Sequence, residues 1–134
     1  MTKISAIAFT AAILATPSYA SEWINLNPNS TQSFFVDRES IVKSGKNKKV
    51  WTIFNLDTKE TVPGHPYFGY LSTKSLWYIT CDERMFATTS LSFYPQHNAQ
   101  GDVLTTITRA LPETTFKEVE PDTAAEAVMR FVCS

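Results

Sequence analysis

The fold class is decided by the segment Lys49-Val50-Trp51-Thr52-Ile53-Phe54-Asn55-Leu56. It is rich in β-branched and aromatic side chains, which are enriched in strands. Side chains alternate between the two faces of a strand, so Trp51 and Ile53 share one face and the even-numbered residues share the other. Because both faces are partly apolar, we predict a strand in the middle of a sheet.

Further strand-like segments lie on both sides of this one. They are predicted at Trp23–Leu26, Ser33–Asp37, Ser40–Lys43, Tyr67–Asp82, Glu83–Tyr94 and Val103–Thr108. Turn residues separate several of them, with hairpin turns expected at 44–47 and 95–101. Residues 57–66 are predicted to be a long polar link, because Pro63 and Pro66 cannot both join a regular ladder of strand hydrogen bonds.

The periodicity changes near the C-terminus, where a single short helix is predicted. Thr123 and Glu126 have the spacing of a capping box, with Pro121 just ahead. The apolar residues that follow recur at helical spacing and form one stripe: Ala124, Val128, Phe131 and Val132. The predicted fold class is therefore α+β, an antiparallel β-sheet of about five or six strands with a C-terminal α-helix packed on one face.

Residues 1–20 have the three parts of a secretory signal. A short positive start containing Lys3 precedes an uncharged apolar run, Ile4–Ala15, and a polar end with small residues precedes a predicted cut after Ala20. The apolar run is shorter than the roughly 20 residues that span a bilayer. We expect an exported single domain at 21–134, either periplasmic or secreted to the cell surface, and no lipid anchor, because no cysteine lies near the cut.

Two cysteines remain in this domain, Cys81 and Cys133. An even number of cysteines in an exported chain predicts a disulfide, although two buried thiols are the alternative. Metal binding by these cysteines is disfavoured by their spacing, since only His65 and His97 could add ligands.

The charge of the domain excludes some partner classes. Without Lys3 the chain has 11 basic and 13 acidic side chains, a formal charge of −2. Such a balance indicates neither nucleic acid nor an anionic membrane as partner. No later stretch is long and apolar enough to span a bilayer.

A search for catalytic motifs finds none of the usual patterns. The sequence has no G-x-S-x-G, no H-E-x-x-H and no phosphate-binding loop. His65 and His97 lie in turns that contain proline, where an exposed loop histidine is the simpler interpretation. The expectation is a protein without catalytic residues, metal or cofactor, and a small hydrolase is the disfavoured alternative.

Two groups of residues are candidates for binding a protein partner. Lys43, Lys46, Lys48 and Lys49 form the one charge cluster, which could contact an acidic partner or a glycan, or could simply protect a sheet edge. Of these, Lys46, Lys48 and Lys49 are the candidate contacts. Tyr67 and Phe68 lie beside the proline-containing link, where exposed aromatic side chains would mark a binding surface.

The order of several short elements resembles the bacterial surface-adhesin protein E-like family. These elements are Trp23, Phe34-Phe35-Val36-Asp37, Ser40-Ile41, Val50-Trp51, Ser72 with Lys74, Cys81-Asp82 with Arg84, and the stretch from Pro121 to Cys133. The resemblance covers nearly the whole chain after residue 20. It implies a small sheet domain with a packed C-terminal helix, a bridge between Cys81 and Cys133, and no enzymatic activity.

The resemblance also implies a function. Founding members of this family are surface proteins that bind host extracellular-matrix and serum proteins, so we expect a non-enzymatic exported protein with protein partners of that kind. The founding adhesin is lipid-anchored, whereas this sequence has no lipidation cysteine. The alternative is therefore a periplasmic accessory or structural protein that binds an envelope partner. Oligomeric state and the identity of the ligand are left open.

Overall fold

The structure, a computed structural model, describes residues 2–12, 20–111 and 114–134. In this part of the chain, eight strands form an antiparallel sheet in the order β1-β2-β4-β5-β6-β7, with β3 beside β4 and β8 beside β6. The strands are β1 (Trp23–Asn25), β2 (Phe34–Asp37), β3 (Val42–Ser44), β4 (Asn47–Val62), β5 (His65–Thr80), β6 (Met85–Tyr94), β7 (Thr105–Thr108) and β8 (Lys117–Glu118). The α-helix is α1 (Ala124–Cys133), and two 3₁₀ turns are η1 (Arg38–Ser40) and η2 (His97–Ala99).

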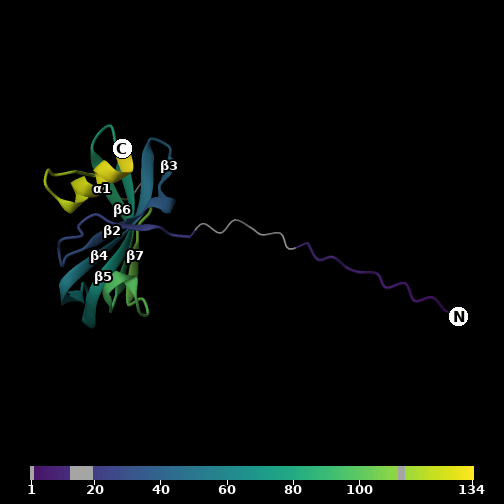
Figure 1. Cartoon of the computed structure of the whole chain (residues 1–134). Helices are drawn as coiled ribbons and strands as arrows, with labels where there is room; N and C mark the ends of the chain where they lie inside the picture. Colours follow the sequence, from purple (N-terminus) through teal and green to yellow (C-terminus); the bar gives the residue numbers. More distant parts are fainter. Residues whose placement is uncertain (1, 13–19, 112–113) are drawn as a thin grey trace.

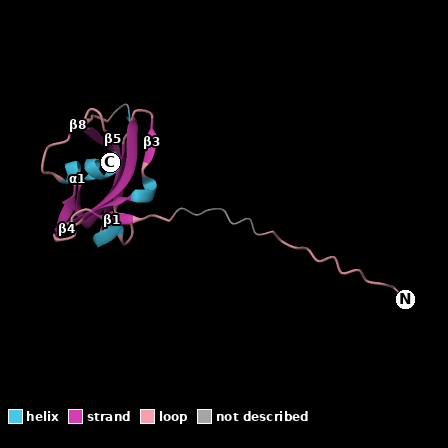
Figure 2. Ribbon diagram, turned by 45° about the horizontal axis from the view of Figure 1, so that its top comes forward, coloured by secondary structure: helices cyan, strands magenta, loops and turns pink. Residues whose placement is uncertain are grey.

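The fold class predicted from the sequence is confirmed, with eight strands in place of five or six. Helix α1 lies against one face of the sheet near the end that carries β3 (Figure 1), and Figure 2 shows the same arrangement from another side. Residues 2–12 extend away from the sheet in both views. Residues 13–19, which hold most of the predicted polar end of the export signal, lie outside the described residues.

The core fills the space between α1 and the sheet. Val128, Met129 and Val132 of α1 are buried against one sheet face. That face carries Phe34, Val36, Val50, Trp77 and Ile79. Stacked aromatic rings cross it from strand to strand, with centroid distances of 5.3 Å for Phe34–Phe54, 5.9 Å for Phe54–Trp77 and 4.8 Å for Trp77–Phe86. Cross-strand aromatic pairs of this kind stabilise a sheet and fix its register.

The prediction of a long link at residues 57–66 is wrong. Strand β4 continues to Val62, β5 begins at His65, and Pro63 and Gly64 form a two-residue turn in which Gly64 has a φ of 78°. The ladder is irregular here, with register shifts that follow Asn55 and Thr61. These irregularities leave Pro66 without a partner in the ladder, so its missing N–H group costs no hydrogen bond.

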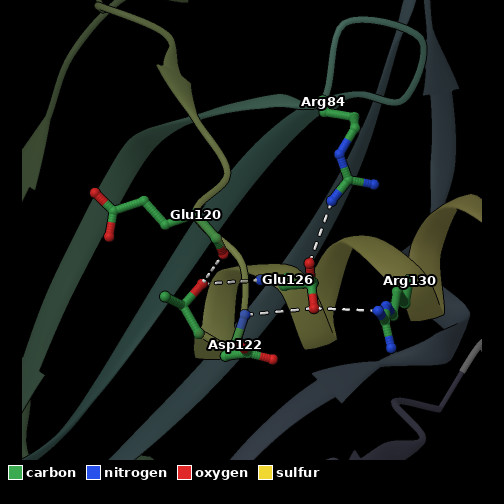
Figure 3. Close-up of polar contacts among 6 residues, drawn as sticks. Arg84, Glu120, Asp122, Glu126 and Arg130 are labelled. Carbon is green, nitrogen blue, oxygen red and sulfur yellow. Dashed lines mark hydrogen bonds and ion pairs between the residues drawn. The ribbon is translucent and has the colours of Figure 1, made fainter.

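Helix α1 begins at the predicted cap, and the capping glutamate, Glu126, also forms two ion pairs that the sequence did not predict. The Thr123 hydroxyl accepts a hydrogen bond from the Glu126 N–H at 3.3 Å. The Glu126 carboxylate accepts from the Asp122 N–H at 3.5 Å and pairs with Arg84 at 3.3 Å and Arg130 at 3.2 Å. Figure 3 shows this carboxylate lying between the two guanidinium groups. The start of α1 is therefore joined to the loop between β5 and β6.

The far end of α1 is held by a covalent bond. Cys81 and Cys133 form a disulfide with a Cα–Cα distance of 5.8 Å, which confirms the predicted bridge. The side-chain amine of Lys48 also donates a hydrogen bond to the Val132 carbonyl at 3.1 Å, at the C-terminal end of the helix where a positive charge is favourable. Both ends of α1 are thus attached to the sheet.

Candidate binding surface

The tip of the β4–β5 hairpin carries the most exposed aromatic side chains of the sheet. Tyr67 is 96% exposed and Phe68 is 38% exposed, as the sequence predicted for both. The His65 ring stacks on Phe68, with 5.3 Å between ring centroids and 12° between planes. We name Tyr67, Phe68 and His65, which follow the turn at Pro63 and Gly64, the tip cluster. Exposed aromatic side chains at the end of a hairpin have the character of a protein-contact surface.

The hairpin that carries the tip cluster is internally packed. Val62 is only 1% exposed although its neighbours along the chain are exposed. The aliphatic part of Lys59 lies directly over Gly69, where a Cβ atom would be 2.5 Å from the Lys59 Cδ. A larger residue at position 69 would therefore displace the Lys59 side chain from this place.

Tyr70 attaches the hairpin to the rest of the sheet. Its ring meets the edge of Phe93 with 4.8 Å between centroids, and its hydroxyl donates to the Glu60 carboxylate at 3.3 Å. Burial raises the pKa of the Tyr70 phenol, and the charge of Glu60 and its hydrogen bond raise it further. The phenol therefore stays protonated, as this hydrogen bond requires.

The three candidate lysines have different surroundings. Lys46 forms a 3.6 Å ion pair with Glu83 on the exposed surface, and Lys48 is bonded to the end of α1. Lys49 follows Lys48 on β4, so its side chain points to the opposite face of the sheet. The lysines therefore do not form one patch, and Lys48 has a structural role that the sequence did not indicate.

The two predicted groups of binding residues lie at opposite ends of β4. Lys46–Lys49 are at its start beside β3, and the tip cluster follows its other end, as the labels of β3, β4 and β5 indicate in Figure 1. At roughly 3.3 Å per residue, the strand from Lys48 to Val62 spans about 45 Å before its irregularities are considered. A single small ligand cannot touch both groups.

The histidines have neighbours that give them no catalytic arrangement. His65 belongs to the tip cluster. The His97 Nε2 atom is 2.8 Å from the Leu56 carbonyl oxygen. His97 lines a shallow pocket with Thr31, Leu56 and Asp57, but within residues 20–111 and 114–134 no hydrogen bond joins its ring to a hydroxyl or carboxylate. In the same ranges, no three histidine, cysteine or acidic side chains gather as metal ligands would.

A second concave region lies on the face of the sheet that α1 does not cover. Trp23, Phe35 and Ile53 line a cavity of about 300 Å³ with Asn98 and Gln100. Sequence analysis placed Ile53 on the same strand face as Trp51, but it did not find the cavity. The missing information is the register of β1, β2 and β4, which aligns residues distant in sequence.

In the part of the chain that the structure describes, no helix is long and apolar enough to cross a membrane. The sequence model of the family described as surface-adhesin protein E matches residues 23–134, and the chain belongs to this family. It is thus a member of a family of exported or cell-surface proteins. Comparison with curated proteins finds no match.

Solved structures with a similar fold include those of Haemophilus influenzae protein E. One, from a second crystal form, is 21% identical, covers 90% of this chain and 94% of its own, and has a TM-score of 0.62. Another, from a non-typeable strain, is 19% identical, covers 88% of this chain and 79% of its own, and has a TM-score of 0.59. At this identity the likeness establishes the fold.

Proposed function

We propose that this protein is a non-enzymatic binding protein that contacts extracellular or host proteins through the tip cluster. The observation that carries the proposal is the 96% exposure of Tyr67 at the end of a packed hairpin. Covering so exposed an aromatic side chain contributes favourably to the free energy of binding. Tyrosine is also enriched among the residues that contribute most of the binding free energy at protein interfaces. Membership of the surface-adhesin protein E family supports the same function.

The packing of the hairpin supports this role. Tyr70 packs against Phe93, and Val62 is only 1% exposed. Binding then costs little ordering of the backbone, because a preorganised surface avoids that entropy loss. In this proposal Lys46 and Lys49 each add a separate contact at the other end of β4, and Lys48 serves chiefly to hold α1.

We also propose that the exported, mature protein is the single domain 21–134, which remains after residues 1–20 are cleaved off behind Ala20. The apolar run and small-residue site at 1–20 support this boundary. Intact mass measurement of the protein recovered from cells tests it, and a mass that includes residues 1–20 would contradict it.

The binding proposal is tested with the double variant Tyr67→Ala/Phe68→Ala. Surface plasmon resonance against a panel of purified host matrix and serum proteins measures affinity for the wild type and the variant. We expect wild-type binding to at least one protein and a loss of about tenfold or more in the variant, as for the central residues of a typical interface.

The matched control is Val103→Ala, which truncates another exposed apolar side chain, 50% exposed, outside the tip cluster. The control variant is expected to bind as the wild type does. Equal affinities of the double variant and the wild type would remove the tip cluster from the contact. Failure of the wild type to bind any host protein would instead favour a partner within the cell envelope.

A further inference from the structure

The cavity on the open face of the sheet lies on the side opposite α1. Trp23, Phe35 and Ile53 alternate along their strands with Ile24, Phe34 and Phe54, which pack in or against the core beneath the helix. Since successive side chains point to opposite faces, the floor of the cavity belongs to the other face. Phe35 and Ile53 are direct cross-strand neighbours of β2 and β4.

The rim of the cavity is a loop held in an uncommon conformation. Asn98 and Ala99 have positive φ values of 60° and 55°, and neither is a glycine. Positive φ is uncommon for such residues, and two in succession need support from their surroundings. Residues in this state gather at ligand sites when the surrounding structure fixes them.

The support comes from two buried polar side chains. Asn55 is 8% exposed; its amide donates to Asn98 Oδ1 at 2.8 Å and its oxygen accepts from the Asn98 N–H at 2.8 Å. Ser72 is fully buried, accepts from the Ala99 N–H at 2.9 Å and donates to the Gln96 carbonyl at 2.5 Å. The loop is therefore fixed in place by the sheet before any ligand binds.

The lining combines an apolar floor with an uncharged polar rim. Two aromatic rings and one aliphatic side chain form the floor, and two amide side chains form the rim. Gln100 Nε2 donates to the Asn98 carbonyl at 3.2 Å, which orients that side chain. Among the described residues, Gln100 Oε1 and Asn98 Nδ2 have no hydrogen-bond partner, which leaves one acceptor and one donor for a ligand.

We propose that this cavity binds one neutral sugar ring of a glycan. A sugar ring has an apolar C–H face that suits an aromatic floor and hydroxyl groups that suit amides, and the uncharged lining favours an uncharged ligand. The volume of about 300 Å³ is at the lower end for small-molecule sites, so the cavity takes one ring of a chain. An aliphatic peptide side chain would make no hydrogen bond with either amide. This proposal is independent of the tip cluster.

The experiment is a titration followed by nuclear magnetic resonance on the purified, oxidised, isotope-labelled protein. The readouts are the indole N–H of Trp23 and the side-chain amides of Asn98 and Gln100. Chitotriose, a trimer of N-acetylglucosamine, represents bacterial cell-wall strands, and lactose represents the neutral ends of host glycans. We expect one of them to shift these three signals with a Kd of about 1 mM, because so small a site gives weak binding. Which sugar does so distinguishes the two sources.

Three variants make the result specific. Gln100→Ala removes the exposed amide acceptor. Asn98→Gly removes the other amide, together with the hydrogen bond that it accepts from Asn55, while keeping a residue that tolerates positive φ. Each is expected to weaken binding by about fivefold, which corresponds to about 1 kcal/mol. The control Gln96→Ala truncates an exposed amide of the same loop that does not line the cavity, and its affinity is expected to be unchanged.

Three results would overturn the proposal. The first is the absence of any shift of the three signals with either sugar up to about 20 mM, well above the expected Kd. The second is equal affinity of Gln100→Ala and the wild type for a sugar that does bind. The third is a stronger shift of the same signals by the blocked peptide acetyl-Gly-Leu-Gly-amide, which would make the cavity a protein contact.

Discussion

The disulfide is expected to supply a large part of the stability of the domain. Cys81 and Cys133 are 52 residues apart in the sequence. Closing a loop of that length in the unfolded chain removes about 14 cal/mol/K of entropy, or about 4 kcal/mol at 25 °C. A domain of about 110 residues unfolds with an entropy of about 0.23 kcal/mol/K, so the double variant Cys81→Ala/Cys133→Ala should melt about 15–20 °C lower than the wild type.

Differential scanning calorimetry of the oxidised wild type and the double variant measures this difference. Because α1 also buries Val128, Met129 and Val132, we expect the variant to fold at low temperature with the helix still in place. The control adds a thiol reductant to both proteins, which should lower the Tm of the wild type and leave that of the variant unchanged. A fall of less than about 5 °C would show that the loop-entropy reasoning fails for this protein.

Three other changes have expected outcomes. Glu126→Gln removes two ion pairs from a side chain that is 12% exposed; because both arginines are largely exposed, we expect a loss of about 1–2 kcal/mol by chemical denaturation, and no loss would contradict a stabilising role. Gly101→Ala is expected to cost more than about 1 kcal/mol, because φ is 87° and the new Cβ would lie 2.8 Å from Pro95; unchanged stability would refute this. The Tyr70 phenol has a raised pKa in the folded state, so its contribution to stability is complete below the ordinary pKa of 10.0 and is lost as pH rises through the folded pKa. The variant Tyr70→Phe should therefore show a smaller fall in Tm above pH 10 than the wild type. Identical profiles of Tm against pH would contradict this.

Local patterns were sufficient to predict the main elements of the fold. Alternation at 49–56 identified a central strand, and the spacing of Thr123, Glu126 and the apolar stripe identified the helix. The register shifts within β4–β5 were not predictable, because they depend on how distant residues pair and not on the composition of residues 57–66. The two-residue strand β8 carries no periodicity that could reveal it.

The exposure of the candidate binding residues was predictable only where it follows from local sequence. Tyr67 and Phe68 lie beside a turn with proline and glycine, and both are exposed as expected. Lys48 was grouped with its neighbours by charge, but its position opposite the end of α1 is a tertiary contact over 84 residues. The open-face cavity likewise joins Trp23 with Gln100, which only the fold brings together.

The central claim is that the tip cluster contacts a host protein outside the cell. The most direct measurement places a photo-crosslinking amino acid at position 67, or at position 103 as control, in protein expressed by intact native cells that are exposed to host matrix and serum proteins. The account predicts covalent adducts with a host protein from position 67 and none from position 103. Adducts from position 67 with envelope proteins alone, or equal adducts from both positions, would contradict it.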